Sequence, residues 1–263
     1  GFVGAFLGLS AFANSGLHFG DLPSVYSWQA QGVVGPLAVL GGLGLPVVME
    51  VFDRVMGKRR ELSFYSRTVL GMTGGIYVVA VGMFFWVMMS GGGAWRGALA
   101  SASMAAIDAR TCGLGYVVGN AVPRAMQWML IAVMIIGAGS GGTGGGVKVT
   151  TVAELWRGVR RALRGEMPGR IFGMAAVVVA GYVGVIGVLL MLLVTVTPQV
   201  PADRMLFDLV SAVGNVGLSM DVLSIVGTPL YILSGAMFMG RFGALLVLWW
   251  VADTAEGAEL PVG

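Results

Sequence analysis

The chain alternates between long uncharged stretches and short segments that hold most of its charges. Uncharged stretches run from Leu22 to Met49, Thr68 to Trp95, Ala125 to Val147, Ile171 to Ala202 and Val222 to Gly240, and the shortest has 19 residues. A helix needs roughly 20 apolar residues to cross a bilayer. These stretches are apolar on every side, whereas a surface helix of a soluble protein is apolar along one stripe. The pattern predicts an all-α integral membrane protein.

Composition supports this fold class. Of the 263 residues, 57% are hydrophobic and 11% are charged, whereas roughly a quarter are charged in a soluble domain. The single cysteine, Cys112, excludes an internal disulfide and a cysteine-based zinc site. The single histidine, His18, has no neighbouring carboxylate or cysteine, so we expect an exposed loop residue and no metal site.

The basic residues gather in two connections between apolar stretches. The first connection holds Arg54, Lys58, Arg59, Arg60 and Arg67. The second holds Arg157, Arg160, Arg161, Arg164 and Arg170. Short loops rich in Lys and Arg stay on the cytoplasmic side of a membrane. The net charge of +3 therefore reflects topology, and no nucleic-acid partner is expected.

An eight-residue motif recurs along the chain. SAFANSGL at 10–17 and SAVGNVGL at 211–218 share five of eight positions, and IDARTCGL at 107–114 is a weaker copy. Such self-similarity at a fixed period indicates a repeated structural unit.

The period of this repeat is nearly constant. The central glycines Gly16, Gly113 and Gly217 are separated by 97 and 104 residues. A short apolar segment precedes each copy and a long apolar helix follows it. Full-length apolar helices at 68–95 and 171–197 also precede the second and third copies. The unit is therefore helix, short helix, glycine-bearing loop, helix.

The glycine turns predict a cation pathway. Irregular backbone at membrane depth persists only where it is buried in protein or lines a water-filled path. Glycine adopts dihedral angles that other residues resist, and exposed carbonyl oxygens can replace the hydration shell of an ion. The negative C-terminal end of each short helix favours a cation at the same place. The alternative is that these small residues only permit close helix packing.

At these motifs the chain resembles the Trk/Ktr/HKT superfamily of potassium transporters, whose members resemble four fused potassium-channel subunits around one pore. GAGSGGTGGGVKVTT at 137–151 is similar to that family's GGSPGSTAGGIKTTT segment, a break in the second helix of unit three. MFMGRFG at 237–243 is similar to MFIGRVG in the last helix, and GGLGLPVV at 41–48 is similar to GGLGFPV in the second helix of unit two.

The resemblance covers nearly the whole chain and implies a pseudo-fourfold fold of helix–pore loop–helix units with the first unit missing. Unit two would occupy residues 1–56, unit three 57–156 and unit four 157–263. It also implies potassium uptake across the plasma membrane, the bacterial inner membrane, by a multi-pass protein that is not an enzyme. Potassium would be the transported ligand, with no organic cofactor.

Partners also follow from the resemblance. Family members lie in membrane lipid, pair as homodimers and bind a cytosolic nucleotide-binding regulatory ring of the TrkA/KtrA kind. The arginine-rich connections offer a contact surface for such a ring.

By position, the resemblance assigns three segments to a filter whose backbone carbonyls bind potassium. They are Asn14, Ser15 and Gly16; Thr111, Cys112 and Gly113; and Asn215, Val216 and Gly217. A glycine at the filter position goes with potassium preference in this family. Cys112 stands where small or β-branched residues are usual, and Asn14 and Asn215 stand where threonine is common in some members. Because carbonyls bind the ion, these departures need not abolish binding.

The resemblance also assigns an intramembrane gating loop below the filter. It comprises Gly139, Ser140, Gly141, Gly142, Thr143, Gly144, Gly145 and Gly146. Ser140 replaces the family proline and Gly142 is an additional glycine, which should make the loop more flexible. Arg241 and Lys148 are implied as a charged barrier in the pore, since a charge within an apolar helix is costly and marks function. The alternatives are snorkelling of Arg241 and an interface position for Lys148.

Further charges lie beside the filter segments. Asp108 and Arg110 flank the third segment, and Asp221 follows the fourth. At an outer mouth, acidic groups would concentrate cations. Solvated loop charges are the alternative.

Two other classes of protein fit parts of the pattern. Gly137, Gly139 and Gly142 match G-x-G-x-x-G, but an apolar helix precedes them where a dinucleotide site needs a strand. A P-loop needs lysine directly after glycine, and Val147 intervenes here. A secondary cation or solute transporter also uses discontinuous helices and repeats. Those repeats are often inverted, whereas the basic connections recur here at the same phase, which favours a pore.

Overall fold

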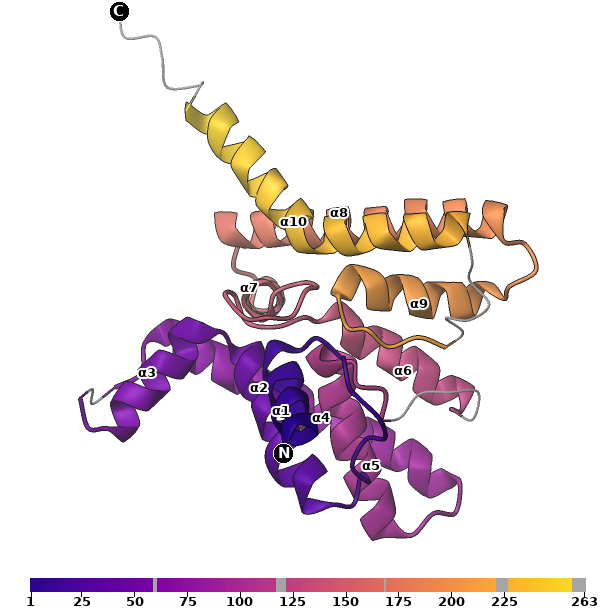
Figure 1. The fold of residues 1–263 in the computed structure, drawn as a ribbon. Coiled ribbons are helices and arrows are strands. Elements are labelled where there is room, and N and C mark those ends of the chain that lie inside the picture. Colours follow the sequence, from indigo (N-terminus) through magenta and orange to yellow (C-terminus); the bar gives the residue numbers. More distant parts are fainter. Residues whose placement is uncertain (59–60, 117–121, 168, 221–226, 257–263) are drawn as a thin grey trace, which may run out of the picture.

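The computed structural model describes residues 1–263 except 59–60, 117–121, 168, 221–226 and 257–263. The regular elements within the described ranges are helices, joined by turns (Figure 1). The predicted all-α fold is therefore confirmed.

Three short helices precede the three glycine turns. They are α1 (Phe2–Ala13), α5 (Trp95–Ile107), which a π-helical turn η2 (Asp108–Cys112) extends, and α9 (Ala202–Gly214). Each of the α-helices has 12 or 13 residues, fewer than the roughly 20 that cross a bilayer. In α9 nine residues are buried, among them Phe207 and Leu209. Helix α9 therefore lies inside the protein, whereas much of α1 is exposed, including Phe2 and Leu9.

The two long helices have the opposite distribution of burial. Helices α4 (Phe64–Ser90) and α8 (Arg170–Val196) each have 27 residues and begin near the positions predicted from the sequence. Only 17% and 11% of their most apolar windows are buried. An apolar helix with its sides exposed suits a lipid environment. Of the helices described, these two are long and apolar enough to cross a membrane, or three if the bent α2–α3 pair counts as one.

The uncharged stretch from Leu22 to Met49 is not one straight helix. It contains η1 (Ala30–Val34), α2 (Gly35–Leu43) and the start of α3 (Leu45–Val55), and the chain bends by 111° between the last two. Gly44 has a φ of 92°, a left-handed value that glycine adopts without a steric penalty. Pro46 in the first turn of α3 lacks the N–H that would continue α2.

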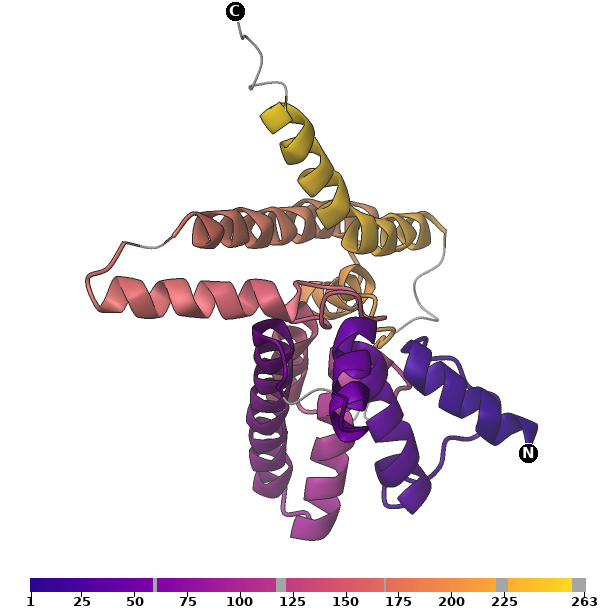
Figure 2. The same cartoon turned by 90° about the vertical axis from the view of Figure 1, so that its left-hand side faces the viewer.

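The uncharged stretch from Ala125 to Val147 is also interrupted, over a longer segment. Helix α6 (Arg124–Ile135) ends after 12 residues and the chain resumes as α7 (Val149–Leu163). Helix α10 (Thr228–Glu256) is continuous, and its C-terminal part projects away from the other helices (Figures 1 and 2).

Two hydrophobic clusters join the repeats. One packs Met126, Leu130 and Met134 of α6 against Phe207 and Val210 of α9, which links the second and third repeats. The other brings residues of α1 and α2 together with α5 and η2; it contains Leu7, Ala38, Met104, Ile107 and Cys112. Because these clusters hold the ends of all three short helices, they place the three glycine turns next to one another.

The second group of arginines is partly helical, whereas the sequence predicted a loop. Arg157, Arg160 and Arg161 lie on α7, which runs beside α8 (Figure 2). The Arg157 guanidinium donates a 2.9 Å hydrogen bond to Thr68 Oγ1 and lies 4.7 Å from the centre of the Phe64 ring. This side chain ties α7 to the start of α4.

Candidate functional site

The first and third glycine turns begin with the same helix cap. Asn14 after α1 and Asn215 after α9 both have a φ of 50°, in the left-handed region. In each turn the asparagine N–H donates to the carbonyl three residues before it, and the next N–H donates five residues back. This Schellman pattern satisfies the last carbonyls of the helix and turns the chain sharply. The repeat seen in the sequence is therefore a repeat of backbone geometry.

The three turns converge. A β-carbon placed on Gly16 would lie 2.6 Å from the Gly113 carbonyl oxygen and 3.3 Å from that of Cys112. A β-carbon on Gly113 would overlap the carbonyl oxygen of Val216, and one on Gly217 would lie 3.6 Å from the Gly113 oxygen. The central glycines predicted from the motif are thus neighbours, with main-chain carbonyl oxygens between them.

The second turn differs in local structure from the prediction. Thr111 and Cys112 belong to the π-helical turn η2, so they lie within a helix and not in an open loop. The first left-handed residue is Gly113, whose N–H donates to the Asp108 carbonyl, 3.2 Å away. The wider π-helical turn delays the helix end by two residues relative to the other two turns.

Side chains tie each turn to the second helix of its own repeat. Asn14 Nδ2 donates to the Ala38 carbonyl at 3.2 Å, and Asn215 Nδ2 donates to the Met237 carbonyl at 3.1 Å. In the middle repeat a different residue takes this role, because Arg110 Nη2 approaches the Gly137 carbonyl at 3.5 Å.

The segment between α6 and α7 is a loop closed at its base. Ile136 and Val147 form a parallel bridge, and the Gly137 N–H donates to the Val147 carbonyl at 2.9 Å. The residues between them include the predicted gating loop, 139–146. A β-carbon on Gly145 would lie 2.6 Å from the Gly214 carbonyl oxygen, so the loop touches the end of α9 directly before the third glycine turn.

The tip of this loop pairs with the break between α2 and α3. The N–H groups of Gly139 and Thr143 donate to the carbonyls of Gly42 and Gly41, at 2.9 and 3.3 Å. The Leu45 N–H donates in return to the Gly141 carbonyl at 3.4 Å. The interrupted pair α2–α3 and the interrupted pair α6–α7 therefore satisfy each other's free backbone N–H and C=O groups. Buried backbone groups need such partners.

Four side chains also reach the loop. Asn14 Nδ2 donates to Thr143 Oγ1 at 2.7 Å, which connects a predicted filter residue to the loop directly. Tyr65 Oη donates to the Ser140 carbonyl at 2.8 Å. The two predicted barrier residues donate as well: Arg241 Nη2 to the Thr143 carbonyl at 3.3 Å, and Lys148 Nζ to the Gly144 carbonyl at 2.9 Å.

Arg241 lies in the middle of α10, not at a helix end. A side chain that snorkels to the membrane surface would start near a helix end. Arg241 therefore starts away from a helix end, and its guanidinium contacts the loop.

The charges expected near an outer mouth are buried. The Asp108 carboxylate accepts hydrogen bonds of 2.6, 2.8 and 2.9 Å from the N–H groups of Leu114, Gly115 and Tyr116. Arg110 is also buried, so the alternative of solvated loop charges is wrong for both residues. His18 is exposed, as predicted, and Asp221 lies outside the described residues.

Sequence reasoning missed two parts of the site. The break at Gly44 had a local signal, a glycine two residues before a proline, which interrupts helices. The contact of Tyr65 with the loop had no local signal, because it joins positions 75 residues apart.

Together these features define a class of protein: a helical membrane protein whose short helices bring glycine turns to one place beside an interrupted helix. The chain belongs to the TrkH family of cation transport proteins, whose family model matches residues 94–253. The family predicted from the sequence motifs is confirmed.

Similar proteins are known from several bacteria. The chain is 27% identical over 278 residues to "Ktr system potassium uptake protein B" of Vibrio alginolyticus, covering 95% of the chain and 59% of that protein. It is 27% identical over 267 residues to "Ktr system potassium uptake protein D" of Bacillus subtilis, covering 94% and 59%. The chain thus spans about 59% of the length of these relatives.

A solved structure shares the fold. The potassium transporter TrkH from Vibrio parahaemolyticus superimposes with a TM-score of 0.69 at 17% sequence identity, covering 91% of this chain and 56% of that one.

Proposed function

We propose that the chain forms three sectors of a potassium uptake pathway in the bacterial inner membrane, with unit boundaries near residues 56 and 156. The convergence of Gly16, Gly113 and Gly217 at main-chain carbonyl oxygens carries this proposal. Rings of carbonyl oxygens can replace the hydration shell of potassium. The names of the relatives, which are potassium uptake proteins, support the choice of ion.

The filter is assigned by position. The carbonyls of Asn14 to Gly16, Thr111 to Gly113 and Asn215 to Gly217 bind the ion, and potassium is the transported ligand with no organic cofactor. The C-terminal ends of α1, η2 and α9 point their negative dipole ends to the turns, which favours a cation.

The loop at residues 139–146 is the gate. Its contacts with Asn14, with the end of α9 and with the break at Gly44 support a position across the pathway. Arg241 and Lys148 hold positive charge beside it and form an electrostatic barrier to cations.

The names of two relatives describe them as parts of a system, which supports a partner subunit. A second copy of the chain and a cytosolic nucleotide-binding ring are the expected partners. The arginines on α7 offer a charged surface for the ring.

Rubidium uptake by the full-length protein in a host that lacks its own potassium uptake tests the proposal. The protein should restore uptake, and Gly217→Ser should reduce it, because a β-carbon there meets the facing turn at a φ of 91°. Gly227→Ser is a matched control, since it also has positive φ, at 77°, but open space around it. No uptake by the wild type, or equal uptake by both variants, would contradict the proposal.

A further inference from the structure

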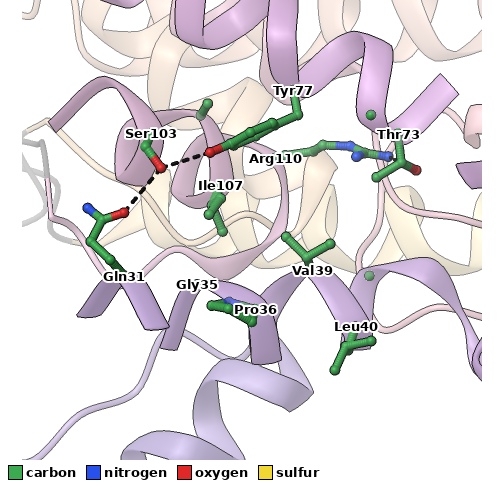
Figure 3. A pocket seen from close by; sticks show the side chains of 13 residues that line it. Gln31, Gly35, Pro36, Val39, Leu40, Thr73, Tyr77, Ser103, Ile107 and Arg110 are labelled. Carbon is green, nitrogen blue, oxygen red and sulfur yellow. Dashed lines mark hydrogen bonds between the residues drawn. The ribbon is translucent and has the colours of Figure 1, made fainter. Parts of the chain in front are cut away.

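A cavity of about 540 Å³ lies between the first and second repeats, beside the residues that lead into the second glycine turn (Figure 3). Helix α2 forms one wall, α4 the opposite wall, and the end of α5 with η2 forms the base. Its size is in the range of small-molecule sites, roughly 300–1,000 Å³. The lining is largely apolar.

The mouth of this cavity opens on the exposed side of α2 and α4. Pro36 and Leu40 on α2 and Gly74 on α4 are exposed and line its outer edge. Gly74 lies within the long apolar helix α4, well away from either end. A molecule that enters here therefore comes from the hydrocarbon layer.

Most polar groups in the wall already have partners. Tyr77 and Ser103 share a 2.8 Å hydrogen bond, and Ser103 donates to Gln31 Oε1 at 3.2 Å (Figure 3). Gln31 Nε2 donates to the carbonyls of Val25 and Ala100. This side of the cavity needs no ligand.

Arg110 at the base is different. Its side chain extends between Tyr77 and Thr73 (Figure 3), and Nη2 donates to Thr73 Oγ1 at 3.1 Å. The residue is only 9% exposed, and its Nε is buried without a hydrogen-bond partner. Within the described residues Arg110 has no carboxylate at salt-bridge distance. The carboxylate of Asp108, two residues before it, binds backbone N–H groups instead. A buried, unpaired cation is costly, and an anion beside it would lower that cost.

We propose that this cavity binds a long-chain fatty acid, with its carboxylate on the Arg110 guanidinium and its chain in the apolar space towards Leu40 and Gly74. The chemistry selects a carboxylic acid over a phospholipid head. A carboxyl group is neutral when protonated and can pass an apolar mouth, whereas a phosphodiester stays charged.

The site also adjoins the proposed gate, although the inference does not rest on that function. Arg110 Nη2 approaches the carbonyl of Gly137, the residue that follows α6 and begins the loop. A bound carboxylate and this carbonyl would share one guanidinium.

Photoaffinity labelling with a diazirine-bearing palmitic acid tests the proposal on the whole purified protein in detergent. Labelled peptides should contain residues of α2 or α4 at the cavity mouth. Excess oleate should prevent labelling, whereas methyl oleate and phosphatidylglycerol should not. Arg110→Gln should weaken oleate competition roughly tenfold or more, because it removes a charge-assisted hydrogen bond.

Two variants on α4 separate binding from folding. A β-carbon at Gly74 or at Gly75 meets no other atom within 4 Å, so both positions accept a side chain. Gly74→Phe should block the mouth and remove labelling, while Gly75→Phe, outside the lining, should label as the wild type does. Equal labelling of these variants, or equal competition by methyl oleate or phosphatidylglycerol, would overturn the proposal.

Discussion

The hydrogen bond between Asn14 and Thr143 joins the first glycine turn to the intramembrane loop, and Thr143→Val removes it with little change of shape. The two atoms are 2.7 Å apart, although 129 residues separate them in sequence. A neutral hydrogen bond contributes about 1 kcal/mol net. Asn14 Nδ2 keeps its bond to the Ala38 carbonyl, so the added cost of an unsatisfied donor should be small.

We take the described conformation as the closed state. Loss of the hydrogen bond, about 1 kcal/mol, then lowers the ratio of closed to open protein about fivefold. Rubidium flux into proteoliposomes measures this ratio. We expect about fivefold higher basal flux for Thr143→Val and unchanged flux for Thr143→Ser, which keeps the hydroxyl. Adding Asn14→Ala to Thr143→Val should change flux by less than the sum of the single effects, because the pair shares one bond.

The result that refutes this reasoning is equally specific. Flux through Thr143→Val equal to the wild type at equal protein level would show that the bond does not hold the loop closed. If Thr143→Ser raised the flux as much as Thr143→Val does, the effect would come from packing and not from the hydrogen bond.

Three other variants extend the test. Gly113→Ala should abolish rubidium uptake without loss of protein, because a β-carbon would overlap a carbonyl of the facing turn at a φ of 61°; Gly115→Ala, at a φ of 79° with open space, should retain uptake. Arg241→Gln should raise basal flux severalfold because it removes the cationic donor to the loop, and Arg241→Lys should restore part of the barrier. Tyr65→Phe should raise flux less than the threonine variant, because its bond to the Ser140 carbonyl is exposed to solvent; an equal or larger rise would contradict this ranking.

The elements that follow from local pattern were predictable from the sequence. Apolar length predicted α4 and α8 to within a few residues at their N-terminal ends, and the repeated motif predicted the turns at Gly16, Gly113 and Gly217. These signals are strong because membrane helices and positive-φ turns depend on nearby residues.

The contacts between distant segments were not predictable in the same way. The break at Gly44 pairs with the loop through main-chain groups, whose hydrogen bonds do not depend on residue type. Charge alone predicts Arg110 at an outer mouth or in a solvated loop, but its partners Thr73 and Gly137 lie 37 and 27 residues away. The π-helical turn η2 forms where α5 ends, among residues of other helices. A short stretch of sequence does not contain the information about those neighbours.

The pairing of the two interrupted helices limits how this joint can be altered. A β-carbon on Gly142 would lie 2.7 Å from the Gly42 carbonyl oxygen, so a side chain at this contact would push the segments apart. Substitution of Gly142 can therefore only loosen the joint. The side chains of Asn14, Tyr65 and Arg241 reach the loop from outside it. Small changes in the stability of the closed loop, and so in its opening rate, have to come from these side chains.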